Sequence, residues 1–208
     1  MRFSTALLIG CAAWLSAQVA PAEEPGADAR DAAVKVAVTT CANCHGAQGR
    51  SINPKFPIIA GQHATYLAAQ LKNFKAQTRG DADAIGYMWG MSAPLSDDLI
   101  EGLAAYYGAQ QPPAGEPSNE ALIARGRDIY ANGVPAESIP PCVSCHGANA
   151  VGTDDFPRLA GQHVQYLLKQ LRSFKNSMRN VAVMHVVTVA LKPDEMTAVA
   201  SYLQSLGG

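Results

Sequence analysis

The stretch that decides the fold is Cys41-Ala42-Asn43-Cys44-His45-Gly46, and it returns in the second half of the chain as Cys142-Val143-Ser144-Cys145-His146-Gly147. The similarity extends beyond these motifs. Residues 60–75 (AGQHATYLAAQLKNFK) and 160–175 (AGQHVQYLLKQLRSFK) are identical at most positions. A sequence that repeats itself over a whole unit indicates a duplicated structural element. We therefore expect two tandem domains of one fold.

The segment between the repeats, residues 110–118 (QQPPAGEPS), contains three prolines and one glycine. This composition favours a semi-extended linker. We place the boundary inside it, which gives an N-terminal domain over residues 23–112 and a C-terminal domain over 113–208. Each unit is small for a self-sufficient apolar core. A large apolar group at the centre of each domain would supply the missing core.

The composition of the chain excludes several classes of protein. It has 208 residues, of which 48% are hydrophobic and 16% are charged, with a formal net charge of −1. The hydrophobic fraction is too high for a disordered chain, and the absence of excess basic charge argues against a nucleic-acid-binding protein. Five cysteines are too few for a disulfide-rich scaffold. No glycine-rich phosphate-binding motif occurs.

The first 22 residues have the features of a cleaved secretory signal. Arg2 is followed by an apolar run over residues 6–15 and by Ala20-Pro21-Ala22, a small-residue cleavage site. A retained membrane anchor is disfavoured because the apolar run is short for a bilayer. A lipoprotein site at Cys11 is disfavoured because the run continues past it. We therefore expect export to the periplasm, with peripheral membrane association left open.

Each repeat has the periodicity of helices and no convincing strand pattern. Tyr66, Leu67, Leu71 and Phe74 lie on one helical face, and the same pattern recurs in the second repeat. Ser96 is a good N-cap for the helix that closes the first repeat. The fold class predicted is all-α, with helices expected over residues 27–40, 62–77, 96–108, 120–130 and 193–207.

The Cys-x-x-Cys-His motif is typical of c-type haem attachment. Two thiols one helical turn apart reach the two vinyl groups of a porphyrin, and the adjacent histidine becomes the proximal iron ligand. A redox disulfide or half of a zinc site is disfavoured because both motifs carry the histidine and lie a domain apart. We expect two covalently bound haem c groups. The predicted attachment residues are Cys41, Cys44 and His45 for the first haem, and Cys142, Cys145 and His146 for the second.

The sixth iron ligand decides between an electron carrier and a reactive centre. Met88 and Met184 are predicted as these ligands, because they are the methionines that match between the repeats, each expected on a loop before a closing helix. A methionine ligand raises the reduction potential of the iron and suits it to electron transfer. Met91, Met178 and Met196 have no such match and are expected to pack or to lie at the surface.

Histidine is the alternative ligand. His63 and His163 also match between the repeats and could form bis-histidine haems. We favour their interpretation as polar residues near the start of a helix, since the paired methionines are available. His185 has no partner in the first repeat and is expected at the surface or at the haem edge, with a ligand exchange in the second haem left open. Trp89 is expected near the edge of the first haem.

These motifs together resemble the cytochrome c4 family of exported two-haem cytochromes. The resemblance rests on both CxxCHG motifs, on the duplicated Pro-x-x-Ala-Gly-Gln stretch leading into Tyr-Leu…Gln-Leu…Phe-Lys, and on the methionine before each closing helix. It covers essentially the whole chain after residue 22. It implies two class I cytochrome c domains related by a pseudo-two-fold axis. It also implies that the haem propionates approach one another across the interface.

The resemblance also implies residues that orient the iron ligands. The carbonyls of Pro57 and Pro157 are expected to accept the ring N–H of the proximal histidines. This sequence departs from the family pattern at two places. An insertion over residues 80–86 lengthens the loop before Met88. Residues 131–141 form a longer, proline-rich segment before the second motif.

The function implied is a periplasmic electron carrier rather than an enzyme. Its partners would be a quinol-oxidising complex or a dehydrogenase as donor, and a terminal oxidase or reductase as acceptor. The alternatives are a haem subunit of a sulfide or alcohol dehydrogenase, and a two-haem enzyme acting on peroxide or thiosulfate. We expect a set of basic side chains mainly to solvate helix faces, with docking or propionate binding as the alternative. These residues are Lys72, Lys75, Arg79, Lys169, Arg172, Lys175 and Arg179.

Overall fold

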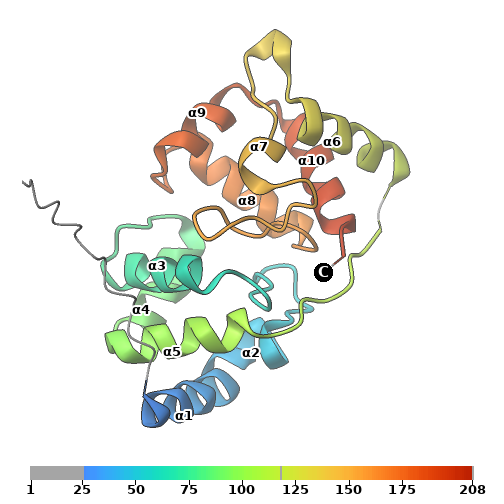
Figure 1. Ribbon diagram of the computed structural model, residues 1–208. Helices are drawn as coiled ribbons and strands as arrows, with labels where there is room; N and C mark the ends of the chain where they lie inside the picture. The colour runs from blue at the N-terminus through green and yellow to red at the C-terminus, as the bar shows by residue number, and fades with distance from the viewer. Residues whose placement is uncertain (1–25, 118, 208) are drawn as a thin grey trace, which may run out of the picture.

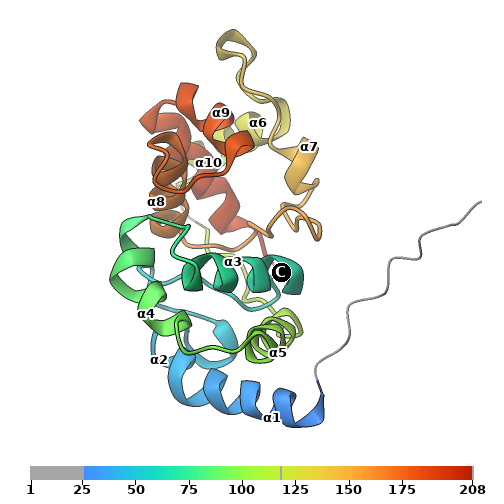
Figure 2. The ribbon, with the colours of Figure 1, turned by 90° about the vertical axis from the view of Figure 1, so that its left-hand side faces the viewer.

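A computed structural model describes residues 26–117 and 119–207 of the chain. This part is helical, with one isolated β-bridge between Val134 and Ile139. Figure 1 shows two helical lobes that follow one another along the chain, and Figure 2 shows them stacked end to end. The expected signal segment, residues 1–22, lies outside the described residues. Within them, no helix has the length and apolarity needed to cross a membrane.

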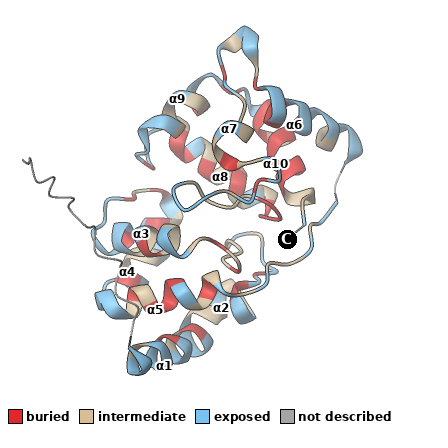
Figure 3. Cartoon of the chain, viewed as in Figure 1, coloured by how far each residue is buried: buried red, intermediate tan, exposed pale blue. Residues whose placement is uncertain are grey.

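The first lobe is built around a contact between its opening and closing helices. Its buried core includes Ala33, Ile100, Leu103 and Tyr107. Figure 3 shows buried residues along α5, whereas the outer face of α1 is exposed. The helices of this lobe are α1 (Ala27–Val36), the π-helix η1 (Ala37–Cys41), α2 (Ala42–His45), the 3-10 turn η2 (Ala47–Gly49), α3 (Ala64–Lys75), the π-helix η3 (Ala84–Met88), α4 (Trp89–Ser92) and α5 (Asp97–Gly108).

The second lobe repeats this plan. Its opening and closing helices pack closely, and its core includes Tyr130, Leu167, Val199 and Leu203. A smaller cluster of Ile139, Leu191 and Met196 extends this core. The helices are α6 (Glu120–Asn132), the 3-10 turn η4 (Pro135–Glu137), α7 (Val143–His146), α8 (Val164–Lys175), α9 (Ala182–Ala190) and α10 (Pro193–Ser205).

Local sequence signals explain where the closing helices begin. The Ser96 hydroxyl accepts a hydrogen bond from the backbone N–H of Leu99 at 3.2 Å, which confirms the predicted N-cap of α5. Helix α10 begins at Pro193, as predicted, and the Glu195 carboxylate accepts from the backbone N–H of Lys192 at 2.8 Å.

The opening helix expected over residues 27–40 is confirmed: it is α-helical to Val36 and continues as the π-helix η1 into Cys41. One prediction about the backbone was wrong in detail. The methionines were expected on loops, but Met88 ends the π-helix η3 and Met184 lies inside α9. The run AVMHVVTVA in α9 has no proline or glycine, so nothing in it interrupts a helix.

The opening and closing helices of the second domain are in close contact at Gly126. A β-carbon added there would lie 2.0 Å from the Ala198 carbonyl oxygen. Since this neighbour is backbone, it cannot rotate away as a flexible side chain would. The glycine is therefore required for the packing of α6 on α10.

Gly126→Ala is expected to destabilise the protein by about 2 kcal/mol or more, because the two helices must separate to admit the methyl group. Denaturant unfolding measures this loss. Gly90→Ala in α4 is the matched control, since its β-carbon would meet no atom within 4 Å. Equal stability of the two variants would contradict the close packing at Gly126.

The domains meet through hydrogen bonds that repeat about a pseudo-two-fold axis. The Gln62 side chain donates to the Arg158 carbonyl at 2.9 Å and accepts from its N–H at 2.8 Å. The Gln162 side chain makes the same pair of bonds with Ile58, at 2.8 and 3.0 Å. Both glutamines are buried. Because each satisfies a backbone N–H and a backbone C=O of the other domain, the interface fixes the domains in one orientation.

Candidate functional site

The two Cys-x-x-Cys-His motifs fold in the same way. In each, the first cysteine is the N-cap of a single helical turn, α2 or α7, that ends at the histidine. After the first, Gly46 adopts φ +75°, where a side chain would be strained and its β-carbon would lie 2.6 Å from the Arg50 carbonyl oxygen. The glycine thus stops the helix directly after His45. All four cysteines of the described residues are free thiols, so neither pair forms a disulfide.

Each motif histidine is held by a proline carbonyl. The Nδ1 atom of His45 lies 2.9 Å from the Pro57 oxygen, and that of His146 lies 3.1 Å from the Pro157 oxygen. Because a carbonyl oxygen only accepts, Nδ1 carries the hydrogen in both rings. In the neutral imidazole the lone pair is then on Nε2, which is left to bind a metal.

Burial keeps these imidazoles neutral. Desolvation lowers the pKa of both His45 and His146, and the hydrogen bond to the proline carbonyl opposes this only in part. A neutral ring is the form that ligates iron. The two sites also share an aromatic neighbour, since Phe56 lies edge-on to His45 with ring centroids 6.4 Å apart and Phe156 to His146 at 6.0 Å.

The first cysteine of each motif lies in a partly buried position. Desolvation raises the pKa of Cys41, and it raises the pKa of Cys142 to about 11. Both therefore remain protonated thiols near neutral pH. Low thiolate character makes them poor redox nucleophiles, which argues against a reactive dithiol and is compatible with thiols that are consumed in thioether bonds.

The two matched methionines have the same backbone support. The hydroxyl of Ser92 donates to the Met88 carbonyl at 2.6 Å, and that of Thr188 donates to the Met184 carbonyl at 2.7 Å. Both hydroxyl residues are fully buried. This pair was not predicted, although a Ser or Thr four residues after each matched methionine is visible in the sequence.

His63 and His163 contact the opposite domain. The Nε2 atom of His63 lies 2.8 Å from the Val151 carbonyl oxygen, and that of His163 lies 2.9 Å from the Ser51 oxygen. Both residues are the N-caps of their helices, α3 and α8. Their ring nitrogens thus bind backbone carbonyls across the interface, in line with the non-ligand interpretation.

The residues that follow the matched methionines anchor the chain near each site. Trp89 donates its indole N–H to the Arg79 carbonyl at 2.8 Å. In the second domain, Nδ1 of His185 lies 2.9 Å from the Phe174 carbonyl oxygen. Each side chain ties the methionine-bearing helix to the segment at the end of α3 or α8.

The expectation that the basic residues mainly solvate helix faces was wrong for the two arginines. Arg79 and Arg179 are each 6% exposed and lie between the domains. They are buried because side-chain oxygens from both domains accept from their guanidinium groups. Lys75 and Lys175 also have structural contacts, since each donates to a backbone carbonyl, of Leu95 and Leu191 respectively, at 2.7 Å.

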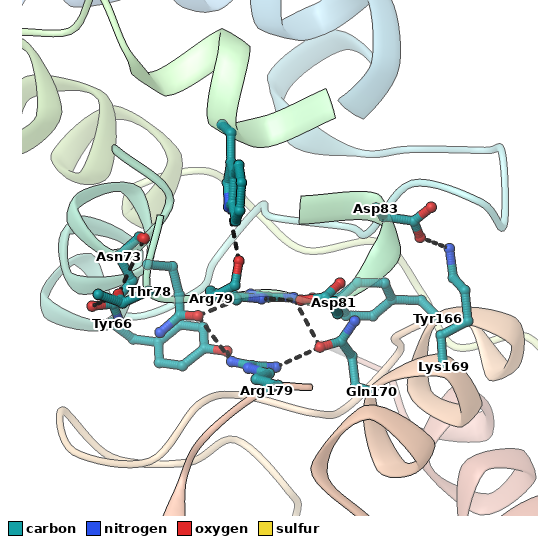
Figure 4. Close-up of polar contacts among 12 residues, drawn as sticks. Tyr66, Asn73, Thr78, Arg79, Asp81, Asp83, Tyr166, Lys169, Gln170 and Arg179 are labelled. Atoms are coloured by element: carbon teal, nitrogen blue, oxygen red, sulfur yellow. Dashed lines mark hydrogen bonds and ion pairs between the residues drawn. The ribbon is translucent and has the colours of Figure 1, made fainter. Parts of the chain in front are cut away.

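The inserted segment of the first repeat is part of this interface. It supplies Asp81, which pairs with Arg79 at 2.6 Å, and Asp83, which forms an ion pair with Lys169 of the other domain. The backbone N–H of Gly80 donates to the Met178 carbonyl at 3.1 Å. The insertion therefore does more than lengthen the segment before Met88, because it also contacts the second domain (Figure 4).

The donor set of each site fits a covalently attached haem. In each domain, two free thiols precede a neutral histidine whose Nδ1 is bound to a proline carbonyl and whose Nε2 is left for the iron. Within the described residues, no group of three or more His, Cys, Asp or Glu side chains could hold a bare metal ion. Fold and sites together define a c-type cytochrome with two haem domains.

Comparison with known proteins identifies the group to which this cytochrome belongs. The family model for cytochrome c matches residues 31–107 and again 123–207. The chain is 38% identical over 190 residues to cytochrome c4 of Stutzerimonas stutzeri, covering 86% of this chain and 89% of the relative. It is 36% identical over 181 residues to the thiosulfate dehydrogenase electron acceptor of Thiomonas intermedia, covering 83% and 81%.

A solved structure gives the same result. The solved structure of Acidithiobacillus ferrooxidans cytochrome c4 superimposes with a TM-score of 0.76 at 39% identity, covering 80% of this chain and 98% of the other. The chain belongs to the cytochrome c4 family. It therefore carries two covalently bound haem c groups, in two tandem all-α domains, and acts in electron transfer.

Proposed function

We propose that the protein is a periplasmic electron carrier whose two haems are six-coordinate, ligated by His45 and Met88 in one domain and by His146 and Met184 in the other. The observation that supports this best is the equivalent support of the two methionines by buried hydroxyls. A haem with histidine and methionine ligands has no open coordination position and a raised potential, which suits a carrier.

The described residues would serve this role by holding the ligands in place. When bound, the haem iron supplies one-electron transfer by cycling between the ferric and ferrous states. The proline carbonyls orient the proximal rings, and the buried hydroxyls fix the backbone of the two methionines. The free thiols Cys41, Cys44, Cys142 and Cys145 supply the attachment points.

Thr188→Val is expected to weaken methionine ligation in the second haem, because the isosteric change removes the hydroxyl that binds the Met184 carbonyl. The ferric methionine-to-iron charge-transfer band should weaken by up to about half, and carbon monoxide binding to the reduced protein should rise. Ser92→Ala should do the same in the first haem. Ser201→Ala is the control, since its buried hydroxyl makes the same type of bond in α10, to the Thr197 carbonyl at 2.8 Å. An unchanged band in Thr188→Val would show that this hydroxyl does not support the ligand.

A more specific role is the acceptance of electrons from a thiosulfate-oxidising enzyme. Support for it comes from the relative in Thiomonas intermedia, whose name describes this activity. The test is reduction of the purified ferric protein, followed in the visible bands of the haem. Thiosulfate alone should not reduce it, whereas thiosulfate with a thiosulfate dehydrogenase should do so rapidly. Reduction by thiosulfate alone would indicate an enzyme, and no reduction with the dehydrogenase would reject this donor.

Export and domain division complete the proposal. We infer that cleavage follows residue 22 and that the domains divide near residue 112. The helices that flank the linker, α5 and α6, end at Gly108 and begin at Glu120. Mass spectrometry of the periplasmic protein should find Glu23 as the first residue.

A further inference from the structure

A buried tyrosine lies against the haem-attachment segment of each domain. Tyr107 and Tyr130 are 4% and 2% exposed. The Tyr107 hydroxyl donates to the Ala37 carbonyl at 3.3 Å, and the Tyr130 hydroxyl donates to the Gly147 carbonyl at 2.6 Å. Ala37 begins the π-helix η1, which leads into the first motif, and Gly147 directly follows the histidine of the second. Each phenol thus holds the backbone that enters or leaves a Cys-x-x-Cys-His turn.

The same tyrosines lie beside the first cysteine of each motif. The Tyr107 hydroxyl hydrogen-bonds the Cys41 side chain. Cys142 packs against the core cluster that contains Tyr130. Burial raises the pKa of both phenols, and the neighbouring cysteine raises it further. Both hydroxyls therefore keep their hydrogen near neutral pH and can act as donors.

The opening and closing helices cross at equivalent points in the two domains. In the first domain, Gly102 of α5 lies against Ala33 of α1. In the second, Gly126 of α6 lies against Ala198 of α10. Gly102 and Ala198 match between the repeats, in the register that pairs the tyrosines of the closing helices. These crossings provide a common reference for the two buried phenols.

The two tyrosines come from opposite helices of their domains. One helical turn beyond the crossing, the opening helix carries Ala37 in the first domain and Tyr130 in the second. On the closing helix, Tyr107 matches Leu203, and all four residues are buried. Each domain therefore places one phenol at the same point by a different route. An apolar side chain would fill this space without the cost of burying a hydroxyl. The presence of a phenol in both arrangements indicates that the hydroxyl has a role beyond packing.

We propose that Tyr107 and Tyr130 are positioning residues of the two haem centres, which act through the first cysteine and the backbone of its motif. After Cys41 forms its thioether bond, its sulfur carries no hydrogen and can only accept. The bond from Tyr107 to Ala37 is long for an O–H···O hydrogen bond, so the phenol hydrogen is also available to that sulfur. Donation to the sulfur favours the more electron-rich ferrous haem, so Tyr107 raises the potential of the first haem.

This proposal rests on haem attachment at the two motifs and is independent of methionine ligation and of the redox partner. The test uses tyrosine-to-phenylalanine variants of the two-haem protein, because they remove the hydroxyl and keep the ring. Tyr106→Phe and Tyr202→Phe are the matched controls. These tyrosines stack on Tyr107 and Tyr130, with ring centroids 5.0 and 5.5 Å apart. In the described part of the chain, neither of their hydroxyls has a hydrogen-bond partner.

Two measurements report the haem rather than the stability of the fold. Resonance Raman spectra report the thioether links through the bending modes of their carbon–sulfur bonds, and spectroelectrochemistry gives the potentials of the haems. Tyr107→Phe is expected to shift the thioether bands of one haem and to lower its potential. Tyr130→Phe should shift the thioether bands of the other haem. The double variant should show both changes, and the two controls should show neither.

Unchanged thioether bands in both Tyr107→Phe and Tyr130→Phe, or equal shifts in the control variants, would overturn the proposal. A change in one domain alone would reject the role of the other tyrosine. The pyridine haemochrome of each variant should show two haems, which separates an effect on positioning from a loss of attachment. The ferric methionine-to-iron charge-transfer band, recorded on the same samples, separates this outcome from a failure of methionine ligation.

Discussion

Replacing Cys142 and Cys145 together by alanine is expected to leave one haem per chain in place of two. The thioether bonds require both thiols of the motif, and without them the second haem has no covalent attachment. The domain should also lose stability, because it is small for its core and the haem fills its centre. The haem-to-protein ratio of the periplasmic product, measured as the pyridine haemochrome, gives the first result, and limited proteolysis gives the second.

The equivalent variant of the first motif is the control for this prediction. Replacing Cys41 and Cys44 should also leave one haem, with proteolysis now directed to the first domain. The four-fold variant should contain none. Retention of two haems by the Cys142 and Cys145 variant would contradict attachment at this motif, and loss of both haems would show that the domains do not mature independently.

Replacing Met184 by alanine is expected to open the second haem. The ferric methionine-to-iron charge-transfer band should fall to about half, and the reduced protein should bind carbon monoxide at one haem. The potential of that haem should fall by on the order of 0.1 V or more, since axial ligands set haem potentials over a range of about 0.8 V. Met88→Ala should have the same effects on the first haem, and the double variant should lack the band.

Unmatched methionines are the controls. Met91 and Met178 are more than 40% exposed and do not match between the repeats, so alanine at either should leave the band and both potentials unchanged. A band that survives in Met184→Ala would exclude this residue as a ligand. His185, which is adjacent to it, would then be the next candidate.

Much of the fold could be predicted from the sequence because the chain is duplicated and its two repeats can be compared with each other. The duplication separates positions that the fold requires from positions that vary, and it singled out the motifs and Met88 with Met184, whereas the role of the prolines came from the family resemblance. The N-cap at Ser96 and the helix start at Pro193 are local signals and were confirmed. The π-helix η1 was not predictable, because one extra residue in a turn leaves the apolar spacing almost unchanged.

The interface could not be predicted because its contacts join residues that are distant in sequence. Arg79 and Arg179 were expected among the basic residues that solvate helix faces, and a helical periodicity gives no sign that each meets a glutamine of the opposite domain. Nor does the sequence show that the insertion provides Asp81 to Arg79. These contacts are therefore a result of the three-dimensional arrangement alone.

The central claim is that both haems have histidine and methionine ligands and serve electron transfer. The visible spectrum of the purified two-haem protein, oxidised and reduced, with and without carbon monoxide, tests it most directly. We predict two haems per chain, low-spin in both oxidation states, with the ferric methionine-to-iron band and little carbon monoxide binding. A high-spin fraction, or clear carbon monoxide binding by one haem, would contradict the account and indicate a site open to ligands.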